Sequence, residues 1–180
     1  MKTKSKKLNR IVKIALLSAI AFMLQTLGSA MGLKVGGFLE IEISDLPALV
    51  GAFALGPLAG FTIELIKNAL HCFITSTGFV GELANLAVNG IFVSVAGIIY
   101  KHKKTKKTAL VSMLAATLAM SAAGILTNLF IMLPLYMPDA AFSVRLGIVL
   151  STITPFNLVK GAVLSVITFL SYKKLKPLLI

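Results

Sequence analysis

Residues 46–73 read LPALVGAFALGPLAGFTIELIKNALHCF, an apolar stretch long enough to cross a bilayer but interrupted at its centre. The interruption is Gly56-Pro57, because a proline disfavours helical backbone at the residue before it. We therefore expect two short helices, at about Leu46–Leu55 and Pro57–Phe73, which fold back on each other. This fold-back decides how many times the chain crosses the membrane.

Four other apolar runs flank this stretch, at about Ile11–Met31, Val80–Tyr100, Thr108–Leu133 and Leu146–Tyr172. The chain of 180 residues is 57% hydrophobic and 13% charged, too little charge to cover a soluble domain of this size. We expect a single all-α integral membrane domain over residues 1–180. A cleavable signal peptide at the N-terminus is disfavoured, because the first run is long and further spans follow it.

The basic residues decide between five and six spans. Basic residues outnumber acidic ones and give the chain a formal net charge of +12. Most of the basic residues lie in the tail 1–10, in the loop 101–107 and after Tyr172. Because basic loops stay on the cytoplasmic side, five spans would place the first two groups on opposite faces. Six transmembrane helices, with short helices 2 and 3, leave both termini and the loop cytoplasmic. Because most of the basic residues cluster at span ends, a nucleic-acid partner is also disfavoured.

Thr154-Pro155 interrupts the last apolar run. Threonine and proline in this order are typical of an N-cap followed by the first helical residue. We therefore expect a final span at about Pro155–Tyr172. Residues 139–153 would then form an outer loop with a short amphipathic helix.

A few polar side chains share one end of this predicted bundle. Glu82 and Asn85 begin the fourth span, Asn128 lies near the end of the fifth, and Asn157 and Lys160 share one face of the sixth. Polar groups inside a membrane are costly and by default mark a ligand or ion path. The alternating segment 38–45, with Glu40, Glu42 and Asp45, predicts an extended strand above them. We expect a pocket for an aromatic, water-soluble molecule, walled by Phe38, Phe79, Phe130 and Phe156.

Each of these groups also has a simpler explanation. Glu82 and Lys160 could neutralise each other as a buried pair, and Asn128 could join two helices. For Glu64, Lys67 and Asn68, spaced along one helix face, we favour such internal pairing, because a self-neutralising set needs no ligand.

No catalytic, metal or cofactor site is expected. His71 and the single cysteine, Cys72, have no further metal ligand nearby in the sequence. The chain also lacks a GxxxxGK[ST] phosphate loop, an HExxH motif and a GxSxG elbow. It therefore cannot hydrolyse ATP by itself, and any active transport needs another energy source.

Ala15 and Ala19, four residues apart in the first span, form a small-xxx-small stripe that lets another helix approach closely. On the pattern alone, contacts within the chain and contacts with a partner are equally favoured.

Together, these features resemble the S components of energy-coupling factor (ECF) vitamin transporters, and more closely their riboflavin-specific members, the RibU type. The resemblance runs from about residue 8 to 175. Besides Ala15 and Ala19, it depends on Leu39–Pro47, Gly56-Pro57, Lys67-Asn68, Gly81–Asn85 and Asn157–Lys160.

The resemblance implies a riboflavin-binding subunit in the bacterial plasma membrane. It takes the vitamin from outside and docks through Ala15 and Ala19 on a membrane coupling subunit driven by two ATPases. The residues implied to contact riboflavin are Leu39, Glu40, Asn128, Asn157 and Lys160, with the segment Gly81–Asn85, which includes Glu82.

Three alternatives remain open. The same scaffold could serve another water-soluble vitamin, such as folate, thiamine or pantothenate. An intramembrane enzyme using Glu82, Lys160 or His71 is disfavoured, because no recognised catalytic spacing is present. A small carrier that works alone would transport without ATPases.

Overall fold

The computed structural model describes residues 2–32, 34–35, 39–40, 43–75 and 79–179. For residues 2–5, 34, 35, 40 and 171–179, it describes the backbone but not the side chain. The described chain consists of helices, the loops between them and two short antiparallel strands, in which Lys34 lies opposite Glu40 and Val35 opposite Leu39. Its elements are α1 (Lys2–Met31), β1 (Lys34–Val35), β2 (Leu39–Glu40), α2 (Asp45–Leu55), α3 (Pro57–His71), α4 (Val80–His102), α5 (Lys106–Thr127), the π-helical η1 (Asn128–Met132), α6 (Leu133–Tyr136), α7 (Phe142–Ile148), the π-helical η2 (Val149–Ile153) and α8 (Thr154–Leu179).

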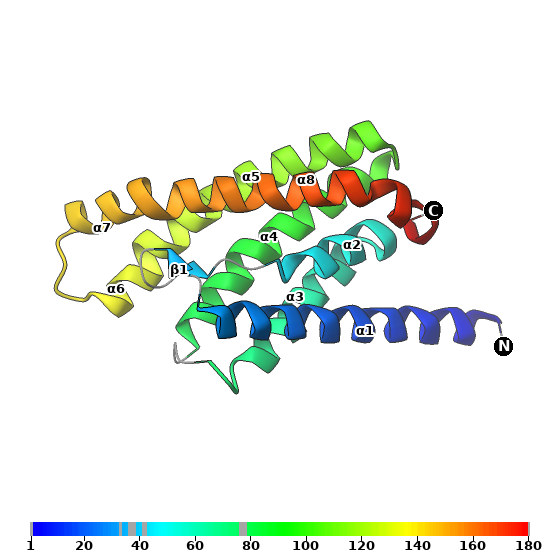
Figure 1. Ribbon diagram of the computed structural model, residues 1–180, viewed down its shortest axis with the longest axis horizontal. Coiled ribbons are helices and arrows are strands. Elements are labelled where there is room, and N and C mark those ends of the chain that lie inside the picture. Colours follow the sequence, from blue (N-terminus) through cyan, green and yellow to red (C-terminus); the bar gives the residue numbers. More distant parts are fainter. Residues whose placement is uncertain (1, 33, 36–38, 41–42, 76–78, 180) are drawn as a thin grey trace.

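The helices form an elongated bundle with two chemically different ends. Figure 1 places both termini at one end and β1, α6 and α7 at the other. Among the residues that the structure describes, four helical stretches are long and apolar enough to cross a membrane: Lys6–Met31, Val80–His102, Lys106–Tyr136 and Phe142–Leu170. The remaining helices of the bundle, α2 and α3, have only 11 and 15 residues.

The predicted fold-back at Gly56-Pro57 is confirmed. Helix α2 ends at Leu55, Pro57 begins α3, and Gly56 between them has a φ of 100°, which a residue with a side chain rarely adopts. Arg10 of α1 donates a hydrogen bond to the Leu55 carbonyl oxygen at 3.1 Å, so α1 also contacts this turn. The turn returns the chain along itself within one apolar run.

Close packing of α2 on α3 depends on Gly60. A Cβ atom added there would lie 2.6 Å from the Ala52 Cβ and 2.9 Å from the Ala48 carbonyl oxygen. We predict that Gly60→Ala lowers the melting temperature in detergent by several degrees, since overpacking costs about 1–3 kcal/mol. Gly147→Ala is the matched control, because its added Cβ meets no atom within 4 Å. Equal melting temperatures for the two variants would contradict this packing.

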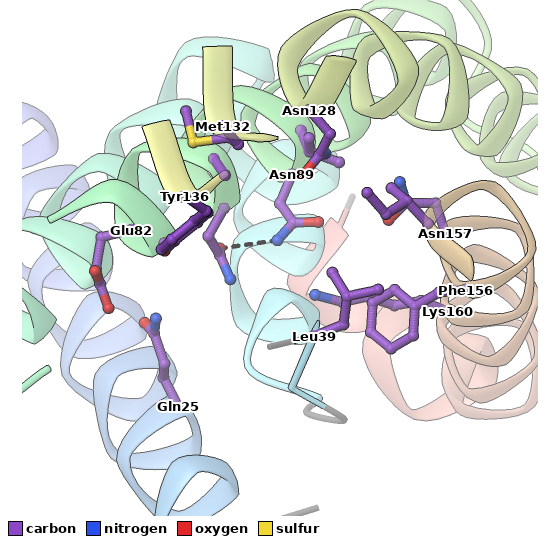
Figure 2. A pocket seen from close by; sticks show the side chains of 15 residues that line it. Gln25, Leu39, Glu82, Asn89, Asn128, Met132, Tyr136, Phe156, Asn157 and Lys160 are labelled. Atoms are coloured by element: carbon purple, nitrogen blue, oxygen red, sulfur yellow. Dashed lines mark hydrogen bonds between the residues drawn. The ribbon is translucent and has the colours of Figure 1, made fainter. Parts of the chain in front are cut away.

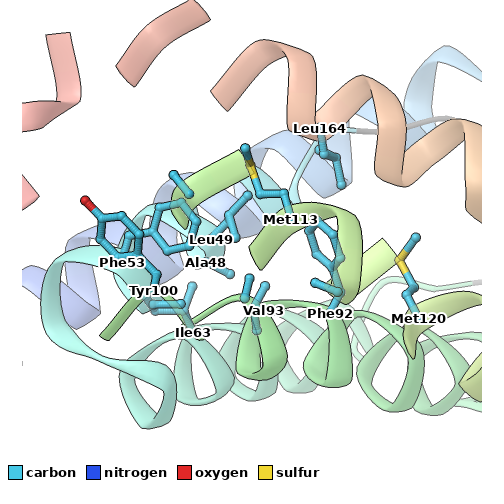
Figure 3. Close-up of a cluster of buried hydrophobic side chains, with 14 of the residues drawn as sticks. Ala48, Leu49, Phe53, Ile63, Phe92, Val93, Tyr100, Met113, Met120 and Leu164 are labelled. Carbon is cyan, nitrogen blue, oxygen red and sulfur yellow. The ribbon is translucent and has the colours of Figure 1, made fainter. Parts of the chain in front are cut away.

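The apolar core lies between α1, α2, α3, α4, α5 and α8, and Figure 3 shows part of it. Phe53 of α2 and Tyr100 of α4 stack with ring centroids 4.3 Å apart. Gly97 of α4 approaches Pro57 so closely that a Cβ atom there would lie 2.9 Å from the proline Cα. The two short helices are thus held inside the bundle by their neighbours, as half-length helices in a membrane require.

The predicted break at Thr154-Pro155 is wrong. Helix runs without interruption from α7 through η2 into α8, and Thr154 lies inside it rather than capping it. The wider π turn accommodates the proline, whose ring would otherwise clash with the carbonyl of residue i−4. The Thr154 hydroxyl donates to the Val149 carbonyl oxygen at 2.9 Å, five residues back. Residues 142–153 are therefore helix, and the outer loop is shorter than expected.

A π-helical segment also extends the preceding span. The π-helical η1 lies directly before Leu133-Pro134, and the Leu133 N–H donates to the Asn128 carbonyl oxygen. Helix consequently continues to Tyr136, past the end predicted at Leu133. Both π segments carry residues that face the cavity described next.

Candidate ligand-binding site

A cavity lies at the end of the bundle away from the termini, between α1, β2, α4, η1, α6, η2 and α8 (Figure 2). Asparagine, glutamine and charged side chains share its wall with aliphatic and aromatic ones. The lining residues are Gln25, Leu39, Gly81, Glu82, Ala84, Asn85, Val88, Asn89, Asn128, Met132, Tyr136, Ile153, Phe156, Asn157 and Lys160. Such a wall suits a small molecule that is partly aromatic and partly polar.

The cavity brings together nearly all of the predicted contact residues from distant parts of the sequence. The lining includes Leu39, Gly81, Glu82, Asn85, Asn128, Asn157 and Lys160. The prediction for the Glu40 side chain, like that for Glu42, lies outside the described side chains. That these residues contact a ligand remains a prediction.

The aromatic wall differs from the expected one. Phe156 lines the cavity, but Phe79 and Phe130 are each 63% exposed and do not. Phe130 lies within η1, where the wider turn changes the angular spacing that regular α-helix would give. Tyr136 and Met132 line the cavity instead, while Phe38 lies outside the described residues.

Sequence reasoning missed two buried amides in the lining, Gln25 of α1 and Asn89 of α4. The Asn89 Nδ2 donates to the Asn85 Oδ1 at 2.8 Å, so the two amides occupy one helix face at i,i+4 spacing. The i,i+4 spacing from Asn85 could have revealed Asn89 in the sequence. Gln25 could have been recognised because an amide side chain is unusual within an apolar run.

Asp45 connects the cavity to the interior of the bundle. Its Oδ2 lies 2.8 Å from the Lys160 Nζ, and its Oδ1 lies 2.6 Å from the Lys67 Nζ. Lys67 also pairs with Glu64 at 2.7 Å, which confirms the internal pairing predicted for this part of α3. The sequence grouped Asp45 with the outer loop, but the residue begins α2 and is fully buried.

These contacts give a buried chain of alternating charge that runs from Lys160 through Asp45 and Lys67 to Glu64. Removing one member would leave a buried charge without compensation, which costs about 3–5 kcal/mol. Lys160 forms an ion pair with Asp45, and its predicted pairing with Glu82 stays a prediction. Lys160 therefore has a fixed place at the cavity wall.

Glu82 forms a contact with His71 of α3. Its Oε1 lies 2.9 Å from the His71 Nδ1, and the His71 Nε2 lies 3.3 Å from the Ser29 Oγ. Within the described part of the chain, no three His, Cys, Asp or Glu side chains form a group that could hold a metal ion. His71 thus has a hydrogen-bonding partner on each side of its ring.

Comparison with known families decides what kind of protein carries this cavity. The model of the family described as "ECF transporter, substrate-specific component" matches residues 9–172. The chain belongs to this family. S components are substrate-binding proteins without enzymatic activity, so the resemblance seen in the sequence is confirmed at the level of the family.

Individual relatives of this S component cover nearly its whole length. The riboflavin transporter RibU of Staphylococcus aureus (strain TCH60) is 33% identical, over 92% of this chain and 89% of the relative. The riboflavin transporter FmnP of Bacillus subtilis (strain 168) is 34% identical, over 95% and 94%. A solved S component of a bacterial ECF transporter superposes with a TM-score of 0.82 at 32% identity, over 96% of this chain and 98% of that one.

Proposed function

We propose that this S component binds riboflavin in the cavity between α1, α4, η1 and α8. The observation that carries the proposal is the mixed lining of that cavity, in a protein whose relatives are named riboflavin transporters. The isoalloxazine ring has carbonyl oxygens that Asn and Lys donors match, and an N–H and ribityl hydroxyls that need acceptors. Phe156 and Tyr136 supply aromatic faces beside the polar groups.

Lys160 and Asn157 are the residues expected to hold the ring edge. They lie one helical turn apart on α8, and both are at the cavity wall. Asp45 fixes the Lys160 ammonium at 2.8 Å, so little rotamer freedom is lost when a ligand carbonyl accepts from it.

The orientation in the membrane follows from charge. The N-terminal basic residues and the basic segment 101–107 lie at the end of the bundle with the termini, and the cavity lies at the other end (Figure 1). By the positive-inside rule, we infer six spans, cytoplasmic termini and a cavity that opens to the outside of the bacterial plasma membrane. Riboflavin would therefore bind from outside.

Delivery needs partners, because the sequence has no nucleotide-binding motif. We infer docking on a membrane coupling subunit, with two ATPases that drive uptake. Ala15 and Ala19 support this inference, since both are exposed on α1 and leave a shallow strip among larger apolar side chains.

The proposal is tested by the pigment that accompanies the purified protein. We expect a yellow protein whose released ligand has the absorption spectrum of riboflavin. Protein that carries no flavin, yet binds folate, thiamine or pantothenate tightly, would assign the same scaffold to another vitamin. Uptake by vesicles containing this chain alone would instead indicate a self-sufficient carrier.

A glycine behind Asn157 offers a milder test of the site. A Cβ atom added to Gly124 of α5 would collide with the Asn157 Nδ2, and the amide would have to move. We predict that Gly124→Ala weakens riboflavin binding several-fold in a fluorescence titration, because a displaced donor loses about 1 kcal/mol of hydrogen bonding. Gly147→Ala, where the added Cβ meets open space, should bind as the wild type does. Unchanged affinity in Gly124→Ala would remove the Asn157 amide from the contact set.

A further inference from the structure

Among the described side chains of α1, Gln25 alone lines the cavity, and only one of its two polar atoms has a hydrogen-bond partner. The residue is 3% exposed, and its Nε2 lies 3.5 Å from the Asn68 Oδ1. Its Oε1 is buried and has no hydrogen-bond partner. Figure 2 shows the side chain extending from α1 toward the cavity, on the side away from Asn157 and Lys160.

The hydrogen bonds of Asn68 determine which amide atom of Gln25 has no hydrogen-bond partner. The Asn68 Nδ2 donates to the Glu64 backbone carbonyl oxygen at 2.9 Å, and a carbonyl can only accept. The Asn68 Oδ1 therefore faces Gln25 as an acceptor and selects the Gln25 Nε2 as its donor. The remaining Gln25 atom is an oxygen, so the cavity gains an acceptor at this point.

A buried acceptor without a partner destabilises the unliganded protein, and a donor on the ligand would remove that penalty. We propose that Gln25 is a specificity-determining residue whose Oε1 accepts a hydrogen bond from a ribityl hydroxyl. This inference rests on riboflavin being the ligand. The α8 side of the cavity carries Lys160 and Asn157, donors suited to ring carbonyls, whereas Gln25 lies across from them and requires a donor.

The inference is tested by comparing two ligands in one variant. Gln25→Met keeps the length and volume of the side chain and removes the acceptor. We expect it to weaken riboflavin binding about tenfold and to weaken binding of lumiflavin, which has the ring but no ribityl hydroxyls, less than twofold. Lumiflavin binding also shows that the cavity of the variant is folded, and Gln25→Leu repeats the comparison with a different side-chain shape.

Thr26→Val is the matched control. Thr26 is the next residue on α1, donates its hydroxyl to the Phe22 carbonyl oxygen and does not line the cavity, so both affinities should stay unchanged. Equal losses for riboflavin and lumiflavin in Gln25→Met, or no loss for riboflavin, would overturn the role of Gln25 while riboflavin binding by the wild type stands. A wild type that binds no flavin would overturn the proposed function itself.

Discussion

Lys160→Met should weaken riboflavin binding by tenfold or more. Hydrogen bonds from a charged donor contribute about 1.5–3 kcal/mol, and methionine offers no donor in the same volume. The side chain is only 9% exposed, so water replaces the lost contact poorly. Fluorescence titration of the purified variant with riboflavin measures the effect. Lys107→Met, at an exposed position of α5, should bind like the wild type.

A double variant separates ligand contact from charge balance. Lys160→Met removes one of the two lysines that pair with the Asp45 carboxylate and leaves Lys67 in contact with it, which also lowers stability. Adding Asp45→Asn removes the excess negative charge, so we expect the melting temperature to recover while riboflavin affinity stays low. Wild-type affinity in the double variant would show that Lys160 matters only through its ion pair.

Ala19→Trp should abolish co-purification with the coupling subunit while leaving riboflavin affinity unchanged. Ala19 is exposed on α1 and does not line the cavity, so a bulky side chain there disturbs neither the core nor the site. It would hold a partner helix away from the strip that Ala15 and Ala19 form. Affinity purification of the co-expressed complex measures the loss, and uptake of riboflavin by cells should fall with it.

The control for this substitution is a tryptophan elsewhere on the lipid-facing surface. Leu118 is 67% exposed on α5, far in the sequence from the alanine strip. Leu118→Trp should assemble normally. Assembly of Ala19→Trp at the level of Leu118→Trp would place the docking surface on another part of the molecule.

The features of the fold that could be predicted are those encoded locally. Gly56-Pro57 stops one helix and starts the next whatever surrounds it, so the fold-back could be predicted from two residues. Thr154-Pro155 was ambiguous, because a proline fits both the first turn of a helix and a π turn inside one. Only packing of the whole helix against α5 and its neighbours distinguishes the two, and the sequence motif does not contain that information.

In the site, too, the residues that could be predicted are those marked by a local signal, and those that could not depend on contacts between helices. Asn128, Asn157 and Lys160 stood out because polar groups are rare in membrane spans, and the structure brings them to one cavity. Asp45 looked like one of several loop acids, because its partners Lys67 and Lys160 come from two other helices. Gln25 was overlooked although it is an amide in an apolar run, and its free oxygen depends on a bond to Asn68 of another helix.

The central claim is that riboflavin occupies this cavity from the outer side of the membrane. Ala84 lines the cavity, and Ala84→Cys in a Cys72→Ser background places one small thiol there. A membrane-impermeant thiol reagent applied to intact cells should label this cysteine, and saturating riboflavin should block the labelling. Labelling only from the cytoplasmic side, or labelling that riboflavin does not change, would contradict the account.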